Sequence, residues 1–440
     1  MNSWLKGILI SSVLLCVLSF GTLAWLAMQT TEPTAGLQRK SPATWDWGFK
    51  SNRPPSQDVV TASLDSAADE LARSIIELAD RLRRLNAAPG VKPNELLLTF
   101  KSPEALKAFR ARAAGLGLKL LNDDERLLTA RVGYDDAEAM ARELRRNAGD
   151  LDNIGLNYLA WVPGLPDLSQ VDATNAGGAM PFGTSGLEAI GAKGDRSEWG
   201  AGSKVAVLDT GVTDHPIFEK TRVTHIDLVN DGETPNGHGT AMASLIAGQD
   251  AADGGVAPAS QILDIRVADT NGESNTALVA EGIMRAVDEG ARVINISLGT
   301  TGDSSVLRLA VEYAQERGVV VVAAAGNEQQ ANLAYPAGYE GVISVAAVDA
   351  AGNQAFFSNS GETLTLSAPG VGIVSAYSDN RMVVSSGTSQ ATALTSGVVS
   401  AMLGWGYSAQ NISDTLIRNA QPTGAPKTQV GAGIVQLPKR

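Results

Sequence analysis

The chain has 440 residues, of which 44% are hydrophobic, and a formal net charge of −12 at pH 7. This length exceeds that of one typical compact domain, so we expect two folded parts with extensions. The acidic balance lacks the basic face that binding to a nucleic acid would require, so we expect no nucleic-acid partner. Because Cys16 is the sole cysteine, the chain cannot close an internal disulfide.

The N-terminal segment carries an uncharged apolar run over residues 8–28, preceded by Lys6. A run of this length can span a bilayer, and Lys6 would then face the cytoplasm, with the rest of the chain outside. A cleaved signal peptide is the alternative, although such peptides usually have a shorter apolar run and a small-residue exit. We therefore interpret residues 1–30 as a signal anchor or a signal peptide, and expect an extracytoplasmic protein that is tethered or secreted.

Residues 31–90 are expected to form a linker that ends in an amphipathic helix over residues 63–86. The apolar side chains with heptad spacing are Leu64, Ala68, Leu71, Ile75, Leu78, Leu82 and Leu85. This spacing is typical of a helix with a coiled-coil seam. The seam indicates either packing on the helix's own neighbours or self-association through residues 64–85.

Residues 91–165 predict a small α+β domain. Strands are expected at 96–100, 118–121, 127–132 and 154–161, with one helix after Ser102-Pro103 and another after Asp135 or Asp136. Serine as the cap and proline at the first helical position favour the first of these helices. The order is that of a split β-α-β, ferredoxin-like domain. Since this part contains no histidine and no cysteine, we expect neither catalysis nor metal binding there.

Residues 181–440 alternate short apolar strands with helices. Strands are expected at 205–208, 262–267, 293–298, 319–325 and 342–348, and helices at 239–247, 276–289, 306–317 and 391–403. Strands that are apolar on both faces predict an α/β fold with a parallel sheet flanked by helices on both faces. In such sheets the chemistry gathers at the carboxyl ends of the strands, where Asp209 and Asn327 follow two of the expected strands.

Three residues could form an activated nucleophile: Asp209 before Thr210-Gly211, His238 before Gly239-Thr240, and Ser389 after Gly387-Thr388. A serine hydroxyl attacks only when an imidazole takes its proton, and a carboxylate is needed to orient that imidazole. Each residue alone also has a structural interpretation, as a turn cap, a core histidine and a helix start. Their common position at strand and helix ends favours catalysis.

Five motifs together resemble those of the subtilisin-like serine proteases, the subtilases. They are Val207-Leu208-Asp209-Thr210-Gly211, His238-Gly239-Thr240, Ser297-Leu298-Gly299, Ala325-Gly326-Asn327-Glu328 and Gly387-Thr388-Ser389-Gln390-Ala391. The family has the same order of Asp, His and Ser along the chain. The resemblance covers residues 181–436. It implies a subtilisin-like fold and a serine endopeptidase that hydrolyses peptide bonds through an acyl-enzyme.

The resemblance also implies roles for single residues. Ser389 would be the nucleophile, His238 the general base and then acid, Asp209 the orienting carboxylate and Asn327 the oxyanion donor. Substrate would bind as an extended strand between two flanking edges. The implied binding residues are Ser297, Leu298 and Gly299 on one edge, Gly272, Glu273 and Ser274 on the other, and Ala325, Glu328 and Ala334 in the first specificity pocket. This pocket would favour apolar side chains or, if Glu328 is more than a solvated rim charge, a basic one.

Residues 91–165 resemble the family's propeptide, and Asn157-Tyr158 falls where such propeptides commonly carry a similar pair. This implies a zymogen whose small domain aids folding, inhibits the enzyme and is cut off between Ala160 and Met180, with residues 166–180 as the processing linker. An unrelated docking domain is the alternative. An inactive fold kept for binding, or a membrane assembly driven by residues 64–85, would be different functions for the whole chain.

The sequence departs from the family pattern at three places. Gln390 follows the candidate nucleophile where many members have an oxidation-prone methionine, and Ala393-Leu394 replaces the usual Pro-His, which puts the start of that helix in doubt. The loop over residues 249–253 lacks the family's calcium pattern. We therefore expect no required cofactor, with Asp250 and Asp253 as weak calcium candidates.

Overall fold

The computed structural model describes residues 62–162, 179–219, 222–250 and 254–439, with side chains from residue 69 onward. The apolar run at residues 8–28, for which an anchor or signal peptide was predicted, lies outside these residues, as do the linker before residue 62 and most of the processing linker. Within the described ranges, no helix is both long and apolar enough to cross a membrane.

A seven-stranded parallel sheet organises the larger part of the structure, in the order β12-β11-β10-β9-β5-β7-β6. The strands are β5 (Lys204–Asp209), β6 (Val223–Asp227), β7 (Gln261–Arg266), β9 (Val293–Ile296), β10 (Val320–Ala324), β11 (Ile343–Val348) and β12 (Leu366–Pro369). The five strands that the sequence predicted are the five central ones. The two that it missed, β6 and β12, are the edges of the sheet.

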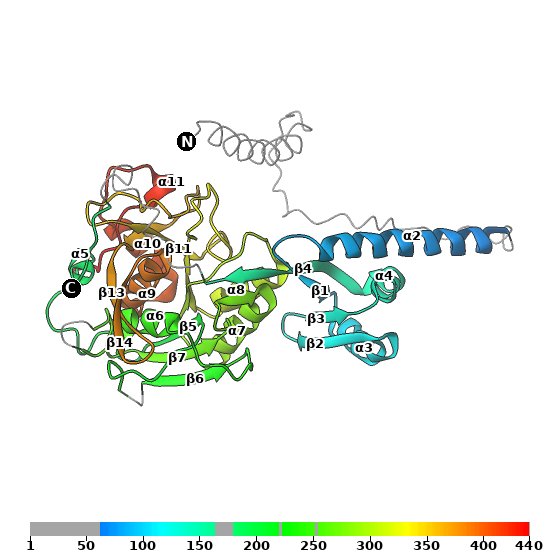
Figure 1. Cartoon of the computed structure of the whole chain (residues 1–440), viewed down its shortest axis with the longest axis horizontal. Coiled ribbons are helices and arrows are strands. Elements are labelled where there is room, and N and C mark those ends of the chain that lie inside the picture. The colour runs from blue at the N-terminus through cyan, green and yellow to red at the C-terminus, as the bar shows by residue number, and fades with distance from the viewer. Residues whose placement is uncertain (1–61, 163–178, 220–221, 251–253, 440) are drawn as a thin grey trace, which may run out of the picture. The chain divides into compact units, whose positions relative to one another are not determined.

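Helices cover both faces of this sheet (Figure 1). They are α6 (His238–Ala247) and α9 (Thr388–Gly404) on one face, and α7 (Thr276–Asp288) and α8 (Ser305–Glu316) on the other. Alternate residues of β5 enter the two cores: Val205 and Val207 pack with α6 and α9, whereas Ala206 and Leu208 pack with α7 and α8. Burial on both faces explains why the central strands read as continuous apolar runs.

Several shorter elements, which no sequence pattern had indicated, complete this part. They are α5 (Gly186–Ala189), the hairpin of β13 (Ile373–Tyr377) and β14 (Arg381–Ser385), α10 (Ala409–Asn419) and α11 (Lys427–Val430). The predicted start of α9 was wrong by three residues. The helix begins at Thr388, directly after Gly387, so the missing Pro-His pair does not delay it.

The N-terminal part is a small α+β domain. Its elements are β1 (Val91–Phe100), α3 (Pro103–Ala113), β2 (Leu118–Asp124), β3 (Thr129–Tyr134), α4 (Ala137–Arg146) and β4 (Leu151–Trp161), with short 3₁₀ turns at Ala114–Leu116 and Ala148–Asp150. The strands pair antiparallel in the order β2-β3-β1-β4. A fifth strand, β8 (Glu273–Asn275), comes from the larger part and pairs with β4. One sheet therefore joins the two parts.

The long helix α2 (Ala62–Asn86) precedes this domain and packs on α4 and β1. Leu78, Ala79 and Leu82 are buried, whereas Leu71 is 39% and Ile76 is 53% exposed. The last part of the apolar seam therefore packs on the helix's own neighbours, as one of the two interpretations expected. Self-association through the remainder stays a prediction.

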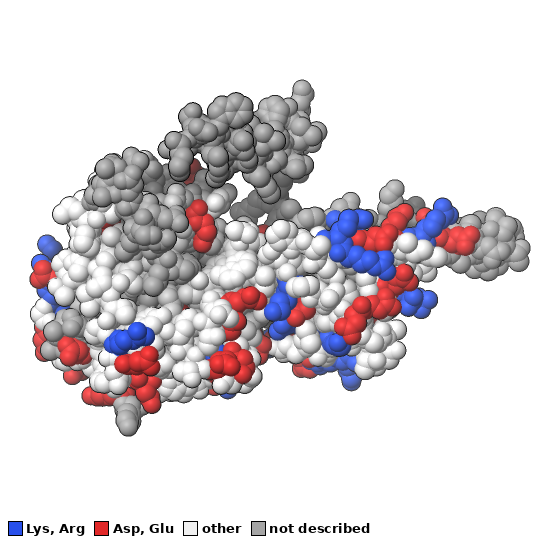
Figure 2. All heavy atoms as spheres, in the orientation of Figure 1, with Lys and Arg blue, Asp and Glu red and all other residues white. Residues whose placement is uncertain are grey.

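Charged side chains of both signs are interspersed on the face that Figure 2 shows. Along α2 and the small domain, acidic and basic groups lie close together. Ion pairs in this part include Arg83 with Asp80 and Arg112 with Glu143. On this face the described residues form no continuous basic field of the kind that attracts a polyanion.

Candidate active site

Asp209 ends β5 and is fully buried, so its carboxylate is held in a low-dielectric setting. Its two oxygens lie 2.8 and 3.0 Å from Nδ1 of His238. The N–H of Thr210 donates to one of the same oxygens at 2.7 Å. This arrangement makes Nδ1 the protonated ring nitrogen and leaves Nε2 free to accept a proton.

His238 is the first residue of α6, and glycines on both sides let it lie close to Asp209. Gly237 has a φ of 100°, which favours glycine, and a Cβ at Gly239 would lie 2.5 Å from the carbonyl oxygen of Gly211. No other residue type could occupy position 239 without moving the helix away from the turn that follows Asp209.

Asn236 links the two sides of this pair, a role that the sequence analysis missed. Its Oδ1 atom accepts the N–H of His238 and the hydroxyl of Thr210, both at 2.9 Å. Its Nδ2 atom donates to the carbonyl of Thr270 at 2.9 Å. The sequence signal was its place two residues before the histidine, where an Asn side chain commonly bonds the backbone ahead of it.

Ser389 lies in the first turn of α9, where the positive end of the helix dipole favours a developing negative charge. Its hydroxyl donates to the carbonyl oxygen of Ser297 at 3.2 Å. Among the described residues, no hydrogen bond joins this hydroxyl to His238. The structure therefore brings Asp209 and His238 into direct contact and places Ser389 on the carbonyl of an expected substrate-binding segment.

Asn327 follows β10 and is fixed by the residue next to the candidate nucleophile. Its Oδ1 atom accepts the N–H of Thr388 at 3.0 Å and the hydroxyl of Thr388 at 2.7 Å. A Cβ at Gly387 would lie 3.2 Å from Nδ2 of Asn327. Because Thr388 occupies the amide oxygen of Asn327, the NH₂ group lies beside Gly387, two residues before Ser389.

The end of β4 lies between the two predicted substrate-binding edges. On one side, Trp161 and Gly299 exchange two backbone hydrogen bonds, each of 3.0 Å. On the other side, Trp161 pairs with Glu273, and the N–H of Val162 donates to the carbonyl of Gly272 at 2.9 Å. The chain's own backbone is thus bound as the extended strand that the sequence analysis expected of a substrate.

A pocket of about 140 Å³ opens beside Trp161. Its lining residues include Leu298, Gly299, Ala324, Gly326, Glu328 and Ala334. Ala325, which was expected there, is instead buried in the core with α7 and α8, because the side chains along this segment alternate in direction. The carboxylate of Glu328 accepts a hydrogen bond of 2.8 Å from Asn359 and so is fixed at the pocket wall.

No calcium site is supported by the described residues. Asp253 lies outside them, and they contain no cluster of three or more His, Cys, Asp or Glu side chains that could hold a metal ion. Asp250 is described and already has an interaction of its own.

Comparison with known proteins decides the family. A sequence profile of the subtilase family matches residues 200–433. The chain belongs to the subtilase family. It is therefore a peptide hydrolase of the subtilisin type, as the motifs implied. The match contains Asp209, His238, Asn327 and Ser389, and excludes the small domain.

Several characterised subtilases are similar to this chain. The thermostable alkaline protease of Halalkalibacterium halodurans is 39% identical over 261 residues, which cover 58% of this chain and 72% of that protein. Thermitase of Thermoactinomyces vulgaris is 38% identical over 247 residues, which cover 54% and 88%. Among solved structures, fervidolysin of Fervidobacterium pennivorans, a keratinolytic enzyme related to subtilisin, matches with a TM-score of 0.64 at 26% identity. That match covers 79% of this subtilase and 60% of the fervidolysin chain.

Proposed function

We propose that this subtilase is an endopeptidase that uses Ser389 as nucleophile, His238 as general base and Asp209 to orient the imidazole. The contact of His238 Nδ1 with both oxygens of Asp209 carries the proposal. Nε2 of His238 takes the proton of Ser389 as its oxygen attacks the peptide carbonyl. The negative oxygen that forms is stabilised by the NH₂ group of Asn327 and the backbone N–H of Ser389.

The second half of the reaction uses the same groups in reverse. His238 delivers its proton to the leaving amine as the peptide bond breaks, and the acyl group stays on Ser389. A water molecule then loses a proton to His238 and attacks the acyl carbon, and the proton returns to the oxygen of Ser389. Asp209 stays ionised throughout and stabilises the imidazolium.

We further propose that the small domain is a propeptide that inhibits the enzyme until the chain is cut after β4. The backbone pairing of Trp161 with Gly299 supports this role, since it occupies the strand position that a substrate needs. Asn157 supports it as well: it is fully buried, and its Oδ1 atom accepts the N–H of Ala277 and the hydroxyl of Thr276, both at 3.1 Å at the start of α7.

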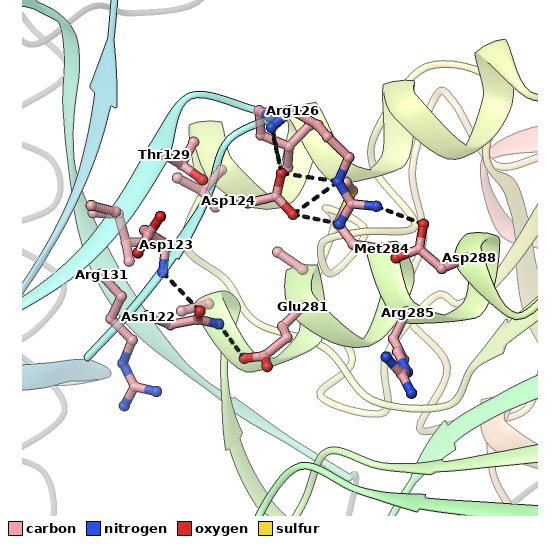
Figure 3. A pocket seen from close by; sticks show the side chains of 16 residues that line it. Asn122, Asp123, Asp124, Arg126, Thr129, Arg131, Glu281, Met284, Arg285 and Asp288 are labelled. Carbon is pink, nitrogen blue, oxygen red and sulfur yellow. Dashed lines mark hydrogen bonds and ion pairs between the residues drawn. The ribbon is translucent and has the colours of Figure 1, made fainter. Parts of the chain in front are cut away.

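A second contact between the two parts lies where the β2–β3 hairpin meets α7, around a pocket of about 210 Å³ (Figure 3). Asn122 donates to the carboxylate of Glu281 at 2.6 Å, and Arg126 pairs with Asp288 at 2.5 Å. These polar contacts add to the strand pairing, so the small domain is held at two separate places. The uncharged run at residues 8–28 would direct the chain out of the cytoplasm. We therefore propose that the protein is a zymogen that is activated there.

The experiment that tests this function compares the full chain with its S389A variant. We expect the parent to lose its N-terminal part and to cleave casein, and S389A to stay at full length without activity. Half-buried Ser413→Ala on α10 is the matched control and should behave as the parent. If parent and S389A both remained intact and inactive, the proposal would be lost.

A further inference from the structure

Two strands beside the candidate active site carry a ladder of opposite charges. β6 is the edge of the sheet and pairs in parallel with β7, which separates it from β5. The register sets His225 against Asp264, and Asp227 against Arg266. Nδ1 of His225 lies 2.9 Å from Oδ2 of Asp264, and Nη1 of Arg266 lies 3.1 Å from Oδ2 of Asp227. Each pair joins an acidic to a basic side chain. The base of the first pair lies on β6, whereas the base of the second lies on β7.

Asp264, like Arg266, lies in the core. It is 4% exposed, and its Oδ1 atom has no hydrogen-bond partner in the described part of the chain. Burial raises the pKa of Asp264, and Asp264 in turn raises the pKa of His225 through their hydrogen bond. A buried carboxylate is costly without a cation beside it. His225 supplies that cation, because the guanidinium of Arg266 is bound by Asp227 and Asp231.

Asp264 also holds the turn that follows Asp209. Its Oδ2 atom accepts the N–H of Val212 at 2.9 Å. The next N–H, that of Thr213, donates to the hydroxyl of Thr240 at 2.8 Å, and Thr240 lies in the first turn of the helix that begins at His238. The buried carboxylate is therefore connected through three residues to both members of the Asp209–His238 contact.

We propose that His225 and Asp264 are a positioning pair for catalysis, which shares one proton and keeps the turn over residues 210–213 at the right place between Asp209 and His238. The proposal rests on the function proposed above, since it assigns the pair to that same site. When the proton leaves, a net negative charge remains in the core beside Asp209, and the turn is held less firmly.

The sign of the pH dependence follows from His225. Its pKa is raised in the folded chain, so the stabilisation is complete below the ordinary histidine pKa of about 6.5 and is lost as pH rises through the raised value. The side chain is 51% exposed and borders a cavity, so its proton exchanges with solvent. Other titratable or charged groups that face the pair are Asp214, His215 and Glu219 from the loop after β5, and Asp209 on β5.

The test measures casein hydrolysis against pH for the full chain carrying H225Q, D264N or both. H225Q leaves the buried carboxylate without its cation, so we expect kcat to fall about tenfold while KM changes by less than about twofold. The H225Q/D264N variant has no buried charge, and its amide oxygen can still accept the N–H of Val212. We expect it to recover to within about threefold of the parent and to lose the part of the alkaline decline in kcat that belongs to the pair.

Thr224 is the matched control position, because it is the exposed neighbour of His225 on β6. T224Q should leave kcat and the pH profile as in the parent. A parental kcat and pH profile for H225Q would overturn the proposal, as would the absence of any recovery, in folding or in activity, when D264N is added. If the parent were inactive and behaved as S389A does, that result would count against the proposed function instead. The unfolding temperatures of H225Q and H225Q/D264N would then decide whether the pair holds the turn.

Discussion

The hydroxyl of Ser389 rests on the carbonyl oxygen of Ser297, 3.2 Å away. Ser297 begins the segment whose third residue, Gly299, pairs with Trp161. The nucleophile and the bound strand thus contact the same stretch of backbone. In the proposed mechanism the hydroxyl must leave this carbonyl oxygen before it can give its proton to His238.

The amide of Asn327 should matter for the rate and little for binding. N327A removes the proposed oxyanion donor, so we expect kcat to fall about 10²–10³-fold with KM nearly unchanged. Steady-state hydrolysis of a peptide substrate by the processed enzyme measures both constants. The exposed Asn411→Ala is the control. A rise in KM with kcat retained would show that Asn327 binds substrate instead.

Gly239 should tolerate no side chain. In G239A the new methyl group would meet the carbonyl oxygen of Gly211, so α6 and His238 must shift away from Asp209. We expect both the unfolding temperature and kcat to fall. Gly115 offers a matched control, since a Cβ there would meet nothing within 4 Å. Equal unfolding temperatures for G239A, G115A and the parent would contradict the close approach of the two segments.

The partly buried carboxyl group of Glu281, which faces Asn122, should make the folded chain less stable as pH rises. Burial under the small domain raises the pKa of Glu281, and Asp124 adds to this effect. A raised carboxyl pKa means that the folded state binds protons more tightly than the unfolded state. Its contribution to stability is therefore present at low pH and is lost between the ordinary value of about 4.3 and the raised one.

The uncut S389A chain allows this contribution to be measured as an unfolding temperature from pH 4 to pH 7. S389A/E281Q should lose less stability over this range, because the amide does not ionise. Glu312→Gln on α8 serves as the exposed control, without effect on the slope. Identical slopes for S389A and S389A/E281Q would refute the assignment to Glu281.

Gln390 should make the enzyme resistant to peroxide. Its side chain is buried beside Ser389 and donates to the hydroxyl of Ser385 at 2.8 Å, so no thioether lies at this position. We expect Q390M to be active and to lose activity in hydrogen peroxide faster than the parent, because methionine sulfoxide is larger and polar. Residual activity over time, with exposed Met382→Leu as control, measures this. Equal inactivation rates would place the sensitive group elsewhere.

The central strands and the contact of Asp209 with His238 were predictable because their signals are local. β5, β9 and β10 are apolar on both faces, and Asp209 and His238 belong to motifs of adjacent residues. The edge strand β6 was missed because it is partly exposed and polar, which is how an edge strand often differs from a central one. The pairing of His225 with Asp264 joins residues 39 apart through sheet register, which no sequence pattern gives.

The position of Ala325 illustrates a second limit. The motif places it beside the specificity pocket, and its two neighbours, Ala324 and Gly326, do line it. Which of three consecutive small residues points into a pocket depends on backbone direction, which their sequence leaves open. Likewise, the contact of Asn157 with Ala277 spans 120 residues and depends on the pairing of β4 with β8, which joins the two parts of the chain.

The pairing of β4 with β8 has a consequence for the fate of the small domain. In the intact chain β4 lies between β1 and β8 and has neighbours on both sides. Once severed and detached from β8, the fragment has an unpaired strand along one margin, with the 42% exposed Trp161 at its end. Open strands of this kind pair with other chains. Under the proposed zymogen function, release of the small domain would therefore be irreversible, because the free fragment becomes a substrate of the protease that it had inhibited.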